Sequence, residues 1–108
     1  MRYNFTAKNM VLSDSLKENT IKKINRLERL FPEDAEVYVV FSVVKLDSTI
    51  EITIPLQKRR LRAEVSNRDM YIALDEVVDI LERQMVKYRK RIKEKARRDV
   101  SFKEELRL

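Results

Sequence analysis

The chain has 108 residues, with 24 Lys and Arg against 18 Asp and Glu, and a formal net charge of +6. This length holds one domain with one modest core. The chain contains no Cys, His or Gly, which excludes disulfides, thiol or imidazole chemistry and glycine-rich phosphate loops. No apolar run approaches the roughly 20 residues that cross a bilayer, and no signal-peptide pattern opens the chain. The composition favours a cytoplasmic binding protein that is not an enzyme and needs no cofactor or metal.

The first half of the chain predicts a strand, a helix and a second strand. Residues 2–8 alternate apolar and polar side chains, which is typical of a half-buried strand. Ser13 is expected to begin a helix that runs to about Leu30. Pro32 ends it, because the residue before a proline is pushed out of the α region. Residues 36–46 are too β-branched and too apolar on both sides for a surface helix, so they predict an interior strand.

The second half predicts two more strands and one long helix. Residues 49–56 alternate cleanly, with the isoleucines on one side. Residues 57–60 form a basic connection, and 61–65 alternate again as a fourth strand. Residues 66–98 read as one long helix, and from 99 to 108 the periodicity weakens, which predicts a frayed or disordered tail.

The long helix combines an apolar face with a charged one. Ser66 and Asp69 predict a capping box at its start. Its apolar residues recur at three- and four-residue steps: Met70, Leu74, Val77, Val78, Leu81, Met85, Tyr88 and Ile92. After Glu82 the only acid before Arg98 is Glu94, while Lys and Arg accumulate. The helix macrodipole favours one or two cations near a C-terminus, so this excess indicates an anionic partner.

The element order β-α-β-β-β-α predicts an α+β fold over residues 1–98. We expect a two-layer sandwich, in which two helices cover one face of a four-stranded sheet and the other face meets water. Side by side, the helices would present one basic platform from Lys22, Lys23, Arg26, Arg29, Arg83, Lys87, Lys90 and Arg91. Such a platform suits the phosphates of structured RNA, which proteins recognise largely through shape and backbone. From the charge pattern alone, an anionic membrane or an acidic protein is the alternative partner.

Two other groups of residues have a functional and a structural interpretation. Asp75, Asp79 and Glu82 could hold Mg²⁺, but acids in the first half of a helix are expected from its dipole, so we interpret them as structural. The aromatic residues Tyr3, Phe5, Tyr38 and Phe41 could stack on bases, but the strand order differs from that of an RNA-recognition motif and a core role is favoured.

Several motifs, in order over about residues 2–95, resemble the ribosome hibernation-promoting factors, also described as ribosome-associated inhibitors. The first helix of that family opens where Asn9, Ser13 and Leu16 stand here. The more specific motifs are Glu51-Ile52-Thr53-Ile54-Pro55-Leu56, Arg62-Ala63-Glu64, Asp69-Met70-Tyr71, Ala73, Asp75, Val78-Asp79, Leu81-Glu82-Arg83-Gln84 and Lys87-Tyr88.

The resemblance implies a fold similar to a double-stranded-RNA-binding domain and a role in translation. Family members bind the small ribosomal subunit in the channel used by mRNA and by A- and P-site tRNA, and so silence idle ribosomes in stationary phase or under stress. The implied partners are small-subunit (16S-type) rRNA and the 70S ribosome, with no membrane and no small-molecule substrate. The implied rRNA contacts are Lys22, Lys23, Arg26, Arg83, Lys87, Arg89, Lys90 and Arg91.

The chain departs from the family pattern in two respects. Residues 57–60 are basic where a polar, often Gly-containing loop is expected. Long family members also carry a second domain that pairs ribosomes, so this chain is expected to be a short member or the first domain of a longer one. Two alternatives remain open: a general structured-RNA-binding module without ribosome preference, and an interaction protein that uses Tyr38, Val40 and Val44 on the open sheet face.

Overall fold

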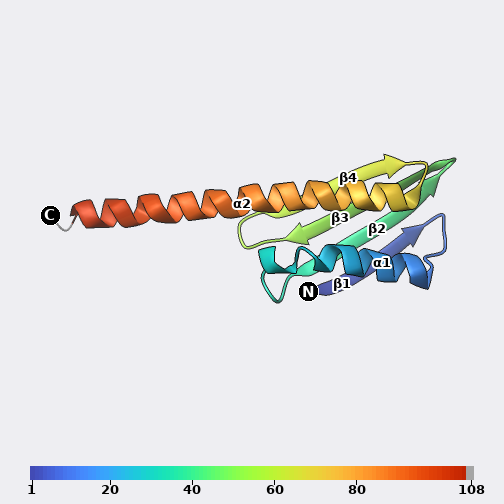
Figure 1. The fold of residues 1–108 in the computed structure, drawn as a ribbon, viewed down its shortest axis with the longest axis horizontal. Helices are drawn as coiled ribbons and strands as arrows, with labels where there is room; N and C mark the ends of the chain where they lie inside the picture. Colours follow the sequence, from blue (N-terminus) through green and yellow to red (C-terminus); the bar gives the residue numbers. More distant parts are fainter. Residues whose placement is uncertain (107–108) are drawn as a thin grey trace.

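The computed structural model describes the backbone of residues 1–106 and the side chains of residues 1–97. It confirms the predicted α+β class, with both helices over one face of a four-stranded sheet (Figure 1). The elements in chain order are β1 (Arg2–Lys8), α1 (Asp14–Asn25), the 3₁₀ turn η1 (Glu28–Leu30), β2 (Glu36–Val44), β3 (Asp47–Pro55), β4 (Arg60–Asn67) and α2 (Met70–Leu106).

The strands lie in the order β1-β2-β3-β4. β1 pairs with β2 in parallel, since α1 supplies the long crossover that a parallel pair needs. The other two pairs are antiparallel, and Ile52 faces Val39 on one side and Ala63 on the other. This register places the inward side chains of three strands in a single layer under the helices.

The core fills the space between the sheet and the two helices. Ile50, Ile52 and Ile54 are completely buried, as the alternation in β3 predicts. Leu81 of α2 is also completely buried above them. Among residues 1–97, Thr20 is the one polar residue that is completely buried, and its hydroxyl is satisfied because it donates to the Leu16 carbonyl at 2.7 Å. Dense packing of apolar side chains therefore fixes how the helices sit on the sheet.

The first helix begins as predicted but ends earlier. The Ser13 hydroxyl accepts a hydrogen bond from the Leu16 amide at 3.1 Å, so the predicted N-cap is confirmed. The helix ends at Asn25 rather than near Leu30, and the 3₁₀ turn η1 follows. This change of pitch lets Leu27 and Phe31 both reach the core, where they are 3% and 8% exposed.

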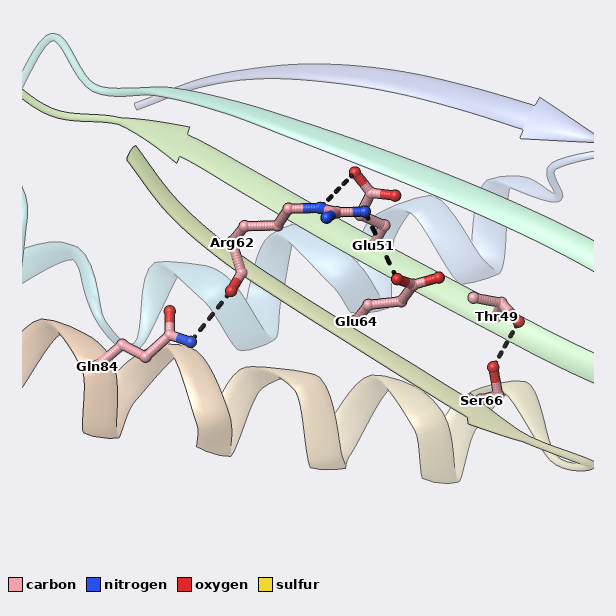
Figure 2. Close-up of polar contacts among 6 residues, drawn as sticks. All are labelled: Thr49, Glu51, Arg62, Glu64, Ser66 and Gln84. Atoms are coloured by element: carbon pink, nitrogen blue, oxygen red, sulfur yellow. Dashed lines mark hydrogen bonds and ion pairs between the residues drawn. The ribbon is translucent and has the colours of Figure 1, made fainter. Parts of the chain in front are cut away.

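The cap of α2 differs from the predicted capping box. The Asp69 carboxylate accepts hydrogen bonds from the amides of Tyr71 at 2.8 Å and Ile72 at 3.4 Å, so Asp69 is the capping residue. Ser66 lies within β4, and its hydroxyl bonds that of Thr49 across the open sheet face at 2.7 Å (Figure 2). The strand continues two residues beyond the predicted Val65, which removes Ser66 from the helix start.

α2 extends well beyond the sandwich. The molecule measures 65 × 22 × 19 Å, and its long dimension follows this helix (Figure 1). Met85 is 2% exposed, whereas Ile92 is 50% exposed, so the prediction that Ile92 lies on the core face is wrong. The helical backbone continues past Arg98 to Leu106, where the sequence predicts a tail over 99–108. The side chains from residue 98 onward lie outside the described part, so the division into a domain at 1–98 and a tail remains a prediction.

Candidate nucleic-acid interface

The two helices lie side by side and run in the same direction (Figure 1). Two contacts support this arrangement: Lys23 of α1 forms an ion pair with Asp75 of α2, and the Arg89 guanidinium of α2 donates at 2.9 Å to the Arg29 carbonyl in η1, the turn that follows α1. Both helices therefore place their basic C-terminal halves toward the same end of the molecule. This alignment concentrates positive charge where α2 leaves the sandwich.

The predicted RNA-binding cations all lie on the helical side of the protein. Lys23 is partly buried, and the others are exposed: Lys22, Arg26, Arg29, Arg83, Lys87, Arg89, Lys90 and Arg91. Two of these exposed residues make internal contacts, since Arg29 and Arg89 share the hydrogen bond described above. The role of these residues in RNA binding stays a prediction.

Acidic residues interrupt the predicted platform between the helices. A groove of about 460 Å³, here called the inter-helix groove, is lined by Lys23, Arg26, Leu27 and Arg29 from the α1 side and by Asp75, Val78, Asp79 and Glu82 from α2. One of the carboxylates, that of Asp75, pairs with Lys23 across the groove. The surface is therefore mixed in charge near the start of α2 and strongly basic only from Arg83 onward.

The basic part of α2 is longer than the predicted site. Lys93, Lys95 and Arg97 are exposed and continue the series beyond Arg91. The sequence already carried this signal, because the cations in this stretch are interrupted by a single acid, Glu94. No structural boundary separates Arg91 from the later cations, since α2 continues without a break.

Charged side chains on the open sheet face form ion pairs with one another. The Arg62 guanidinium contacts Glu51 at 3.1 Å and Glu64 at 3.6 Å (Figure 2). The hydrogen bond from Arg62 lowers the pKa of Glu51. At the β1 edge of the sheet, Arg2 pairs with Glu36 at 3.1 Å. The two faces of the molecule thus differ sharply, with paired charges on the sheet and an excess of cations on the helices.

The aromatic residues divide between the two faces. The rings of Phe5 and Phe41 stack at 6.2 Å between centroids, and those of Tyr3 and Phe5 at 6.0 Å. The Tyr3 hydroxyl donates to the Asn25 side chain, and burial, followed by the charge of Glu28, raises the pKa of Tyr3 to about 12. The core interpretation is confirmed for Phe41, which is completely buried, and for Tyr3 and Phe5, which pack against the core, but it is wrong for Tyr38. Tyr38 is 40% exposed on the open face, where its hydroxyl donates to Glu36 at 2.7 Å.

Within the described residues, no helix combines the length and the apolar character required to cross a membrane. The same residues contain no group of three or more Asp, Glu, His or Cys side chains placed to hold a metal ion. In the inter-helix groove, Asp75 forms the ion pair with Lys23 described above.

Comparison with known proteins agrees with this fold. The family model described as "Sigma 54 modulation protein / S30EA ribosomal protein" matches residues 3–93. The chain therefore belongs to this family, which confirms the resemblance found in its motifs.

Individual relatives cover most of the chain. The ribosome hibernation promotion factor of Bacillus subtilis is 38% identical over 106 residues, which are 95% of this chain and 56% of that protein. The ribosome hibernation promoting factor of Escherichia coli is 32% identical over 94 residues, which are 87% of this chain and 99% of that protein. The chain thus matches about half the length of the first relative and nearly all of the second.

Solved structures share the architecture. The N-terminal domain of Thermus thermophilus Protein Y has a TM-score of 0.75 and 28% identity, and the match covers 82% of this chain and 99% of that one. A ribosomal subunit interface protein from Coxiella burnetii has a TM-score of 0.74 and 26% identity, and the match covers 83% of this chain and 99% of that one. The sandwich is common to these proteins, whereas the last turns of α2 lie beyond the family match, which ends at residue 93.

Proposed function

We propose that this protein is a ribosome-associated hibernation factor that acts in the cytoplasm. It binds small-subunit rRNA in the channel used by mRNA and by A- and P-site tRNA, and it silences idle ribosomes by steric exclusion. The observation that carries the proposal is the concentration of exposed cations at one end of two parallel helices, in a family whose relatives are named as hibernation factors.

The charge distribution supports RNA as the ligand. Each Lys or Arg that neutralises a phosphate releases condensed counterions, so a series of such contacts gives salt-sensitive affinity. Arg83, Lys87 and Lys90 follow each other at three- and four-residue steps along the exposed side of α2. The self-paired sheet face supplies no comparable excess of charge. The helical side is therefore the side that faces rRNA.

The shape supports a mechanism that requires no catalytic residue. A body of 65 × 22 × 19 Å is slender enough to lie along an RNA-lined channel and long enough to cover more than one ligand position. Once bound there, its backbone and side chains occupy the volume that mRNA and tRNA need. Translation stops because the ligands are excluded, and it resumes when the protein dissociates.

Co-sedimentation with purified ribosomal subunits tests the proposal. Small subunits, large subunits and intact ribosomes are each pelleted with the protein over a salt series, with and without an excess of free duplex RNA. We expect tight binding to small subunits and intact ribosomes that resists the duplex competitor. If free duplex RNA displaces the protein from small subunits and intact ribosomes, the protein is instead a general structured-RNA-binding module. Binding confined to large subunits would contradict the proposed partner.

A further inference from the structure

A second groove lies where α2 leaves the sandwich, and its floor is apolar. We call it the exit groove; its volume is about 380 Å³, and the apolar part of its lining, here called the floor, includes Leu30, Phe31, Leu56, Tyr88 and Ile92. These residues come from η1 and the turn after it, from the position directly after β3 and from α2. Ile92 is half exposed here, which the packing of the core does not require. Exposed apolar surface in a concave, polar-rimmed site is typical of a binding site.

Cations surround this floor. Arg29 and Arg89 line the exit groove, and the hydrogen bond from the Arg89 guanidinium to the Arg29 carbonyl, 2.9 Å, holds that guanidinium at the rim. An adjoining hollow of about 280 Å³ shares Tyr88 and Ile92 with the exit groove and adds Lys58 and Lys95. Among the residues whose side chains the structure describes, 1–97, those that line the two hollows include no Asp or Glu. The site is therefore apolar at its base and positively charged around its edge.

We propose that the exit groove binds one unpaired nucleotide of rRNA, with the base against Tyr88 and Ile92 and the flanking phosphates at the cationic rim. A nucleotide combines a flat, poorly hydrated ring with an anion, and the groove offers a partner for each part. RNA-binding proteins recognise unpaired bases by stacking them on aromatic side chains, with cations along the backbone. The inference rests on the proposed function and deepens it.

The groove also explains how a basic protein distinguishes folded rRNA from a plain duplex. Duplex RNA has phosphates for the cations of α2, but its bases are paired and stacked and cannot enter the groove. Folded rRNA offers bulges and loops whose bases are free. The exit groove therefore adds a contact that only the folded ligand makes, and it does so beside Arg29 and Arg89 of the predicted interface.

Two matched variants on the same helix test this inference. Ile92 and Val86 are both branched aliphatic residues of α2 and are both 50% exposed, but Val86 lines neither hollow. Ile92→Asn makes the groove floor polar without changing the net charge, and Val86→Asn makes the same kind of change elsewhere. Binding to small subunits is measured by co-sedimentation, and the Watson–Crick edges of unpaired rRNA bases are probed with dimethyl sulfate in the complexes.

We expect wild type and Val86→Asn to protect the same bases, one of which becomes reactive with Ile92→Asn. Loss of one stacked base is expected to weaken binding roughly tenfold, while Val86→Asn stays within about twofold of wild type. Circular dichroism of both variants verifies that they fold.

Three results would overturn the inference. If Ile92→Asn binds small subunits with wild-type affinity and unchanged base protection, the groove holds no nucleotide, although the proposed function stands. If wild type forms a dimer in sedimentation velocity that Ile92→Asn disperses and Val86→Asn preserves, the groove holds a second copy of the chain. If wild type does not bind small subunits at all, both the proposed function and this inference fail.

Discussion

Lys23 of α1 forms an ion pair with Asp75 of α2 across the inter-helix groove. The lysine side chain is 25% exposed and the carboxylate 60%, so the contact lies near the surface and contributes little to stability, about 0–1 kcal/mol. We expect a larger effect on RNA binding, because the ion pair partly neutralises Lys23, one of the cations predicted to meet RNA.

Removal of that carboxylate is expected to strengthen RNA binding. In Asp75→Asn, Lys23 is free to meet a phosphate. The slope of log K against log salt should therefore become steeper by the amount expected for about one additional phosphate contact. Glu76→Gln is the matched control, because it removes the same charge from the neighbouring position, which does not line the inter-helix groove. Binding isotherms for small subunits at four salt concentrations measure both slopes. Identical slopes for the two variants would show that the ion pair does not withhold Lys23.

Charge reversal on the exposed side of α2 is expected to abolish most of the affinity. The double variant Lys87→Glu and Lys90→Glu replaces two phosphate contacts with two repulsions, so we expect a loss of roughly 100-fold or more at physiological salt. Both side chains are exposed, so the free energy of unfolding should change by less than about 0.5 kcal/mol for each position. Co-sedimentation and urea unfolding measure the two effects.

A second double variant controls for net charge. Lys8→Glu with Arg68→Glu changes the charge equally at the opposite end of the molecule, where β1 ends and α2 is about to begin (Figure 1). Its binding should weaken much less. An equal loss for the two double variants would mean that binding depends on overall charge and not on the helical surface.

Leu81 is expected to contribute to stability and not to binding. It is completely buried between α2 and the sheet, so Leu81→Ala leaves a cavity and should lower the free energy of unfolding by about 2–5 kcal/mol. Val86→Ala, at a half-exposed position of the same helix, should cost less than about 1 kcal/mol. Urea unfolding followed by circular dichroism measures both. A small effect for Leu81→Ala would contradict the packing of α2 against the core.

The pKa of Glu51 should depend on Arg62. The hydrogen bond from the Arg62 guanidinium lowers the pKa of Glu51 in the folded state. A carboxyl whose pKa is lowered by folding stabilises the protein above its unfolded pKa, and this contribution is lost as pH falls through the folded pKa. Arg62→Gln should therefore raise the pKa of Glu51 and weaken the acid dependence of stability. Carboxyl NMR titration measures the change, and an unchanged pKa would exclude Arg62 as its cause.

Most of the fold could be predicted from the sequence because period-two and period-3.6 patterns report directly on buried faces. The isoleucines at 50, 52 and 54 fixed the inward face of β3, and Ser13 fixed the start of α1. Ile92 and Ser66 were assigned wrongly for a common reason. A periodic pattern gives the face of a helix, but it does not say where the neighbouring sheet ends or which residue the last strand reaches.

The positive charge of the candidate site could be predicted from the sequence, whereas the arrangement of its side chains on the surface could be predicted less well. The accumulation of Lys and Arg after Glu82 identified α2, but the pairing of Lys23 with Asp75 depends on how two helices meet. The exit groove could not be predicted from the sequence, because Phe31, Leu56 and Tyr88 come from three distant parts of the chain. In the sequence Ile92 only continues the apolar face of α2, and its half-exposed position is seen in the structure alone.

Competition with the natural ligands of the channel tests the central claim most directly. Ribosomes are loaded with a defined mRNA and with tRNA in the A and P sites, and binding of the protein is then compared with binding to empty ribosomes by co-sedimentation. Steric exclusion predicts that the loaded ribosomes bind at least tenfold less protein, and that added protein blocks later loading of mRNA and tRNA. Undiminished binding to loaded ribosomes would place the protein elsewhere on the ribosome and contradict the proposed mechanism.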